Sequence, residues 1–214
     1  MKKNILAELA MVIFVIVVGM PISANAALIT SGTVYYDWAE RNLVYDTDLD
    51  ITWLDYSHGV TNWDGQVAWA NDLSFTIDGV TYDNWRLPSA GASPLVGYND
   101  TSSEMGHLFY SELRMVNQTI GGVTSTAKLN SSQYFDNLIA GFFWSGTEND
   151  DGSSNSVWAF YTNVGSQGAT ASKDYDGYGL AVIDGQVAPV PIPSTSLLLG
   201  TGLAGLIGAR RKKG

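Results

Sequence analysis

The chain has 214 residues, of which 21 are acidic and 11 basic, and it contains no cysteine. The lack of cysteine excludes disulfides, thiol nucleophiles and thiolate metal sites, so a folded domain must be stable through burial alone. The two histidines fit no His-x-x-x-His spacing, and no Gly-x-Ser-x-Gly motif occurs. The sequence therefore predicts no catalytic residues and no enzyme, with a hydrolase built from carboxylates as the alternative.

The first 26 residues are typical of a secretory signal peptide. Lys2 and Lys3 form a basic start, an apolar stretch follows over 9–20, and Ala24 and Ala26 give the small-x-small pattern that a signal peptidase accepts. We expect cleavage after Ala26. An uncleaved membrane anchor is the alternative.

The last residues predict a membrane anchor. Residues 194–209 carry no charge and would form a helix about 24 Å long, somewhat shorter than the roughly 30 Å bilayer core, and snorkelling of the basic side chains makes up part of the difference. The basic residues that follow are Arg210, Arg211, Lys212 and Lys213. Basic residues at both ends of the chain favour a cytoplasmic location for both ends, which places the domain between them outside the cytoplasm.

The intervening domain, residues 27–188, is strongly acidic. Without Glu8 and the six lysines and arginines of the two ends, it keeps 20 acids and 5 bases, a net charge of −15. Such a surface repels nucleic acid and anionic membranes, and it suits a cation or a neutral glycan. Solubility alone would explain the charge equally well.

Short strands dominate the first half of this domain. We expect strands at 33–37, 43–46 and 51–55, with a connection at 40–42. A helix begins near Asn62, where Thr61 and Asp64 form a capping box and Trp63, Val67, Ala70 and Leu73 share one face. The Asp78-Gly79 pair predicts a tight hairpin.

The second half continues with one helix and several strands. The helix is predicted over 103–116, with an apolar stripe of Met105, Leu108, Phe109 and Val116. A Ser/Thr/Gly-rich surface loop follows at 121–133, and strands follow at 142–147, 157–162 and 178–183. The order predicts a single α+β domain with two helices packed on antiparallel sheets.

The C-terminal residues carry a resemblance to a known family. Val190, Pro191, Ile192 and Pro193, the apolar stretch and the basic cluster occur in this order within 189–214. This arrangement resembles a PEP-CTERM sorting signal, with Ile192 where the family signature has glutamate. The resemblance implies processing by exosortase, a membrane enzyme of Gram-negative bacteria that make extracellular polysaccharide. It implies anchoring in the inner membrane in transit and display at the cell surface or in a biofilm matrix.

A second resemblance covers about residues 42–185. The run Trp-Arg-Leu-Pro at 85–88, the run Trp-Ser-Gly-Thr-Glu at 144–148 and the aromatic segments around them occur in one family's order. They resemble the Lcl C-terminal-like domain of bacterial surface proteins, which is related in fold to C-type lectins. The resemblance implies a C-type-lectin-like fold and a glycan-binding role. From the residues, Trp85 and Leu87 should be buried and Arg86 paired with an acid, with a ligand role for Arg86 as the alternative.

A polar loop between two predicted strands is a candidate calcium site. It offers carboxylate and amide oxygens, which Ca²⁺ prefers, from Glu148, Asn149, Asp150, Asp151 and Asn155. In C-type lectins the corresponding loop carries a calcium site that binds sugar hydroxyls. An acidic turn without a ligand is the alternative.

Two further acidic segments allow the same pair of interpretations. Asp46, Asp48 and Asp50 alternate along the chain but lack the glycine and glutamate of an EF-hand loop, and Asp174 and Asp176 form a similar turn. A solvated turn is the alternative to calcium in both cases. His107 is expected at the boundary of the second helix rather than as a base.

These observations predict a non-enzymatic surface protein. Its exposed tryptophans and tyrosines would stack on sugar rings, while Asp and Asn would bond sugar hydroxyls, with calcium as the candidate cofactor. The expected partners are signal peptidase, exosortase, the membrane and an extracellular polysaccharide, and no nucleic acid. A structural matrix protein without a defined ligand is the alternative.

Overall fold

The computed structural model describes residues 28–150 and 155–187. The predicted cleavage site at Ala24 and Ala26, the sorting motif at 190–193 and the basic cluster at 210–213 lie outside these residues. Among the described residues, no helix has the length and apolar character needed to cross a membrane. The span predicted at 194–209 is not among them.

The N-terminal strands build a four-stranded antiparallel sheet. It contains β1 (Leu28–Tyr36), β2 (Ala39–Asp46), β3 (Ile51–Leu54) and β12 (Val182–Asp184), in that order. β3 is buried along its whole length, as expected for a central strand rich in large apolar residues. The turn between β1 and β2 falls at Asp37-Trp38, where both residues have positive φ, and not at the predicted 40–42, because residues 39–42 already pair with β1.

A six-stranded sheet forms the second layer. Its strands are β4 (His58–Thr61), β11 (Gly177–Gly179), β8 (Phe142–Glu148), β9 (Ser156–Tyr161), β10 (Ser166–Ser172) and β7 (Gly97–Tyr98), in the order β4-β11-β8-β9-β10-β7. The β11–β8 pair is parallel, which differs from the purely antiparallel sheets predicted. The predicted strand at 178–183 is two strands, β11 and β12, so this segment crosses from one sheet to the other.

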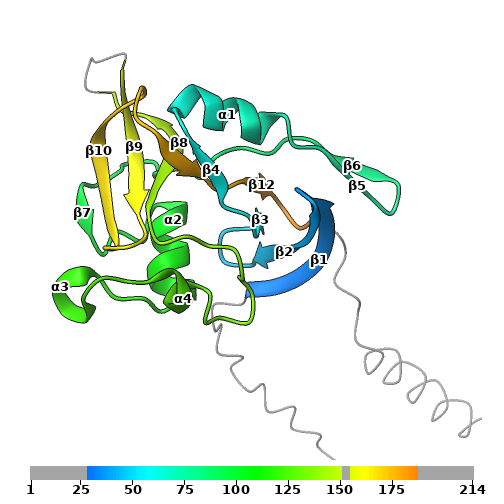
Figure 1. Ribbon diagram of the computed structural model, residues 1–214, viewed down its shortest axis with the longest axis horizontal. Coiled ribbons are helices and arrows are strands. Elements are labelled where there is room, and N and C mark those ends of the chain that lie inside the picture. Colours follow the sequence, from blue (N-terminus) through cyan, green and yellow to red (C-terminus); the bar gives the residue numbers. More distant parts are fainter. Residues whose placement is uncertain (1–27, 151–154, 188–214) are drawn as a thin grey trace, which may run out of the picture.

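The first helix and the hairpin after it largely match the prediction. α1 (Trp63–Asn71) buries Trp63 and Ala70, but Asn62 caps it in place of Thr61, because the Asn62 side chain accepts a hydrogen bond from the backbone N–H of Gly65. β5 (Phe75–Ile77) and β6 (Val80–Tyr82) pair across Asp78-Gly79. Figure 1 shows this hairpin projecting from the body of the domain.

The second helix is shorter than predicted and changes its winding. α2 (Glu104–Gly106) runs into a π-helical turn, η1 (His107–Glu112). Met105, Leu108 and Phe109 are buried as expected, whereas Val116 lies beyond the helix and is exposed. The predicted surface loop at 121–133 contains the end of α3 (Gln118–Gly121) and all of α4 (Thr126–Leu129), and most of its residues are exposed.

The two runs that carry the second resemblance pack against each other. The backbone N–H of Gly146 donates to Pro88 O (2.8 Å), and Ala90 N–H donates to Thr147 Oγ1 (2.9 Å). β8 shifts its register against β9 between Trp144 and Glu148, which frees this part of the strand for that contact. The result is an α+β fold with many strands and few helices, consistent with the predicted class.

Trp85 and Leu87 are buried and Arg86 is paired, which confirms the structural interpretation of the run at 85–88. Arg86 Nη1 and Nη2 donate to the two carboxylate oxygens of Glu104 (both 2.8 Å), and Nη2 also donates to Asp184 Oδ1 (2.6 Å). A backbone bridge between Arg86 and Val182 adds a second link. Arg86 thus ties the first residue of α2 to β12.

Candidate functional site

The tip of the β1–β2 hairpin carries the most exposed large apolar side chain of the described residues. Asp37 (φ 48°) and Trp38 (φ 63°) form a two-residue turn in which both residues are left-handed, and the Trp38 side chain is 89% exposed. Such turns prefer Asn-Gly, because an L-residue in this conformation costs about 1–2 kcal/mol. A tryptophan here forgoes burial and accepts backbone strain, a combination that is typical of ligand-contact positions.

Side chains beneath the turn hold it in one geometry. The Tyr56 hydroxyl donates to Asp37 Oδ2 (2.7 Å), and Arg41 Nε donates to the backbone carbonyl of Tyr36 (3.3 Å). The Arg41 guanidinium lies 4.8 Å from the centre of the Tyr56 ring, and Tyr36 meets the same ring edge-on at 5.1 Å. Trp38 is therefore presented from a braced turn, which lowers the entropy lost on ligand binding.

The pKa of Tyr56 should show whether its hydrogen bond to Asp37 forms in solution. Burial and the hydrogen bond to Asp37 raise the pKa of Tyr56 from 10.0 to about 12. Because the folded chain holds the phenolic proton more tightly than the unfolded chain, folding stability should fall as the pH rises from about 10 to 12. We expect Asp37→Asn to lower the Tyr56 pKa by removing the nearby negative charge. Ultraviolet titration of the wild type, Tyr56→Phe and Asp37→Asn isolates this one phenol. An unchanged Tyr56 pKa in Asp37→Asn would contradict the assignment.

An open groove of about 290 Å³ begins at Tyr56. Hydroxyl, amide and charged groups line much of it: Arg41, Tyr56, Ser57, Thr126, Asn130, Asp136 and Asn137, with Leu138 and Ile139. Arg41 Nη1 donates to Asn137 Oδ1 (2.7 Å), and the buried Asp55 holds the backbone of 136–137. Tyr56 thus belongs both to the hairpin tip and to a groove with the polar groups that sugar hydroxyls bond.

Three side chains of the predicted calcium loop, those of Glu148, Asn149 and Asn155, are directed to partners within the protein. Glu148 accepts from Lys173 Nζ (2.8 Å), and the Asn149 amide donates to Ser156 Oγ and to the carbonyl of Ala169. Asp150 is exposed, and Asp151 lies outside the described residues. The amide of Asn155 donates to Asp174 Oδ2 (3.1 Å), so the structure brings the two predicted acidic turns together.

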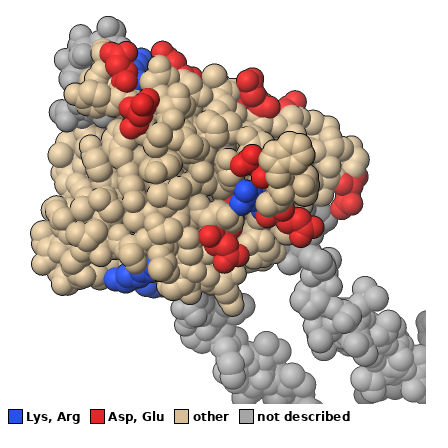
Figure 2. All heavy atoms as spheres, in the orientation of Figure 1, with Lys and Arg blue, Asp and Glu red and all other residues tan. Residues whose placement is uncertain are grey.

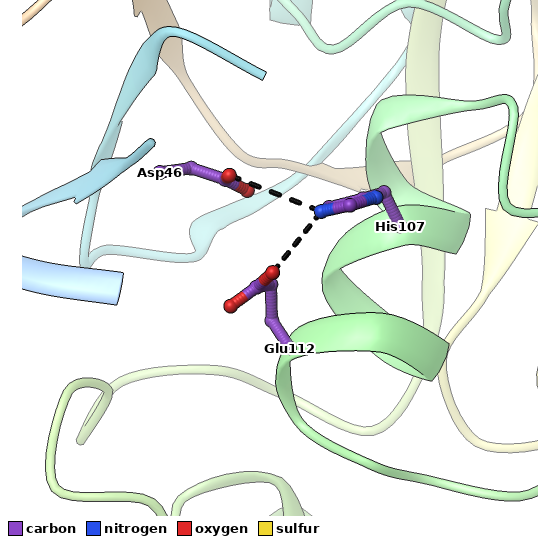
Figure 3. A group of neighbouring side chains, drawn as sticks. All are labelled: Asp46, His107 and Glu112. Carbon is purple, nitrogen blue, oxygen red and sulfur yellow. Dashed lines mark hydrogen bonds and ion pairs between the residues drawn. The ribbon is translucent and has the colours of Figure 1, made fainter. Parts of the chain in front are cut away.

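A second cluster joins residues that the sequence did not connect. Asp46, His107 and Glu112 each offer an atom within 4.8 Å of the others, and Figure 3 shows the three side chains converging from β2 and η1. His107 Nε2 lies 3.0 Å from Glu112 Oε1 and 3.9 Å from Asp46 Oδ1. Asp46 is buried, which contradicts the interpretation of this residue as part of a solvated turn.

No pattern in the sequence indicated that these three residues form a cluster. Asp46 accepts hydrogen bonds from the backbone N–H groups of Asp48 and Leu49 (both 3.1 Å), so it shapes the β2–β3 turn from inside. His107 and Glu112 are five residues apart, a spacing that an α-helix does not bring onto one face. Only the π-turn aligns them, and no sequence pattern identified it.

The chain was compared with protein-family models, with curated proteins and with solved structures. No protein-family model matches the chain, and no curated protein or solved structure matches it.

Proposed function

We propose that this chain is an exported cell-surface or biofilm-matrix protein, processed by signal peptidase and exosortase, whose C-type-lectin-like domain binds an extracellular polysaccharide. The observation that carries the binding role is Trp38, which is 89% exposed and held at φ 63° on a braced hairpin tip. Tryptophan offers a flat apolar face with the area of a sugar ring, and the neighbouring groove offers polar groups such as the Asp136 carboxylate and the Thr126 hydroxyl. The tryptophan face suits the apolar face of a pyranose ring, and the polar groups of the groove suit its hydroxyl groups.

The charge distribution favours a neutral glycan. Figure 2 shows acidic side chains in several separate groups on one face, with few lysines and arginines among them. Sulfated or phosphorylated polymers would meet this surface with repulsion. A neutral polysaccharide avoids that cost and still finds hydrogen-bonding partners.

The hairpin tip is well placed for display. Leu28 pairs with Asp46, Asp46 with Ile51, and Ile51 with Asp184, so the first and last strands have their outer ends at one end of the four-stranded sheet. The turn at 37–38 lies at the other end of β1, about 25–30 Å away along the strand. An anchor that follows β12 would leave Trp38 facing away from it.

A glycan-array experiment on the purified full-length chain tests the proposal. We expect binding to neutral polysaccharide fragments, weakened at least about tenfold, or 1.4 kcal/mol, by Trp38→Ala. Tyr175→Ala is the matched control, because Tyr175 is an aromatic residue that is 63% exposed on the β10–β11 connection. Trp38→Gly should abolish binding and keep the protein as stable as the wild type or up to about 1 kcal/mol more stable, because glycine adopts positive φ freely.

Repeating the array in calcium and in EDTA separates the candidate sites. Binding that needs calcium and survives Trp38→Ala would overturn the hairpin site in favour of the loop at Glu148–Asn155. Concentration-dependent self-assembly that Trp38→Ala abolishes, without glycan binding, would favour a structural matrix protein. Turnover of a polysaccharide would favour a glycan-processing enzyme.

A further inference from the structure

The cluster of Asp46, His107 and Glu112 lies where the turn after β2 meets η1, away from the hairpin tip. Asp46 ends the strand that begins at the tip, so the length of β2 separates the two sites. The three donor atoms come from two parts of the chain about sixty residues apart, as the residue numbers show. An ion bound here would join the four-stranded sheet to the second helix.

The π-turn aligns two of the three side chains. A π-turn has N–H groups that bond to the carbonyl five residues earlier, as the N–H of Leu113, directly after η1, does to Leu108 O (2.9 Å). His107 and Glu112 are therefore one turn apart and lie on the same face. In an α-helix, two residues five apart would point about 140° away from each other around the axis. π-turns are rare and recur at functional sites, so this winding is an independent pointer to a site.

Both carboxylates are buried, and one of their oxygens has no hydrogen-bond partner. The side chains of Asp46 and Glu112 are each 1% exposed. Asp46 Oδ1 accepts two backbone hydrogen bonds, while Asp46 Oδ2 is buried and accepts none. The indole N–H of Trp53 stabilises the charged form of Asp46. It makes no hydrogen bond of normal geometry to Asp46 Oδ2, so both atoms are left without a hydrogen-bond partner. Figure 3 shows the Asp46 carboxylate pointing toward the imidazole.

Burying two acids beside each other is costly without a cation. Burial removes the water that would stabilise the two carboxylates, and their ligand oxygens lie within 4.8 Å of each other, so the two negative charges repel. A protonated His107 would supply one positive charge against these two acids and Asp48, whose Oδ2 lies 4.0 Å from His107 Nε2. A divalent ion supplies two charges and accepts lone pairs from all of these groups.

We propose that Asp46, His107 and Glu112 bind a divalent transition-metal ion of the zinc class, with the fourth coordination position open toward Asp48. An imidazole among carboxylates suits Zn²⁺ better than Ca²⁺, which takes an all-oxygen shell of six to eight ligands. Zinc–ligand bonds of about 2.0–2.2 Å place tetrahedral ligand atoms about 3.3–3.6 Å apart. His107 Nε2 lies 3.0 Å from Glu112 Oε1 and 3.9 Å from Asp46 Oδ1, two separations that bracket this range, and the ligand atoms of the three residues all lie within 4.8 Å of one another. Asp48 is 42% exposed at its side chain, so the ion can enter from solvent on that side.

Zinc titration of the untagged, metal-free full-length chain tests this proposal. We expect one saturable site by competition with a chromophoric chelator, and a rise in Tm on zinc addition. Glu112→Gln and His107→Gln should each weaken binding by more than the roughly 10–100-fold that loss of an outer-shell partner costs. His58→Gln is the matched control, because it removes the only other histidine. Calcium chloride should not displace the zinc.

A spectroscopic measurement on the wild type keeps the test independent of the folding of the variants. The imidazole ¹⁵N signals of the two histidines are assigned with His58→Gln, and zinc should shift those of His107 and leave those of His58 in place. Zinc affinity unchanged in both ligand variants, His107 signals that do not respond, or preferential binding of calcium would each overturn the proposal. In those cases the cluster is an ion pair between imidazolium and carboxylates.

Discussion

Replacing Asp55 by alanine should lower the free energy of unfolding by about 2–4 kcal/mol. Asp55 is fully buried, and its carboxylate accepts from the backbone N–H groups of Asp136 and Asn137 (both 3.0 Å) and from the Asn137 side chain (2.9 Å). Alanine leaves all three donors without this acceptor. Burial raises the pKa of Asp55, so part of the hydrogen-bond energy offsets the cost of the buried charge, and the loss stays below the sum of three charged hydrogen bonds.

Urea unfolding at pH 7 measures this loss, and Asp184→Ala is its matched control. Asp184 also accepts a charged hydrogen bond, from Arg86 at 2.6 Å, but its side chain is 80% exposed. Exposed ion pairs contribute about 0–1 kcal/mol, so the control should lose far less. Equal losses in the two variants would show that the loop at 136–137 does not depend on Asp55. The groove beside Tyr56 should also lose its shape in Asp55→Ala, and glycan binding should weaken with it.

Local signals in the sequence were sufficient wherever a short segment determines its own structure. Asp78-Gly79 forms the predicted hairpin because both residues reach positive φ at little cost. The periodicity of α1 correctly identified Trp63 and Ala70 as buried, but Val67 is half-buried, and the periodicity missed Gln66, a polar residue that is fully buried. The α+β class followed from the order of such segments. These elements depend on neighbours in the chain, so a pattern of a few residues contains the information.

Elements that depend on distant partners were not predictable in the same way. β10 is rich in Ser, Gly and Ala and becomes a strand because β9 and β7 lie on either side of it. The strand predicted at 178–183 divides because β11 pairs with β8 and β12 pairs with β3. In both cases tertiary pairing overrides local preference.

The candidate sites likewise combine features that a short segment of sequence predicts with features that depend on distant residues. Exposed aromatic residues and a sugar-binding role were expected, but nothing near Trp38 indicated a left-handed turn, since tryptophan is disfavoured there. The acidic run at 46–50 was noticed for its carboxylates, yet strand alternation could not reveal that Asp46 turns inward toward a helix sixty residues later. Calcium at Glu148–Asn155 stays a prediction, and the pairing of Glu148 with Lys173 is an interaction that a bound ion would have to replace.

Trp144→Ala should cost about 3–5 kcal/mol of unfolding free energy, the second large effect we expect. Trp144 begins the run at 144–148, is fully buried in the same core cluster as Trp85 and Leu87, and donates its indole N–H to the carbonyl of Thr61 (3.2 Å). Alanine would leave a cavity that neighbouring rings such as Phe142, at 4.6 Å, fill only partly. The cost should appear as a lower urea midpoint with an unchanged slope.

The matched control is the same substitution at Trp38, where the side chain is 89% exposed. Trp38→Ala keeps a side chain at positive φ and removes almost no buried area, so its unfolding free energy should stay within about 0.5 kcal/mol of the wild type. The two variants then separate two uses of one residue type: Trp144→Ala should lose stability and Trp38→Ala should lose glycan binding. A large loss of stability in Trp38→Ala would mean that its ring packs against the protein, and the hairpin tip would no longer be a binding surface.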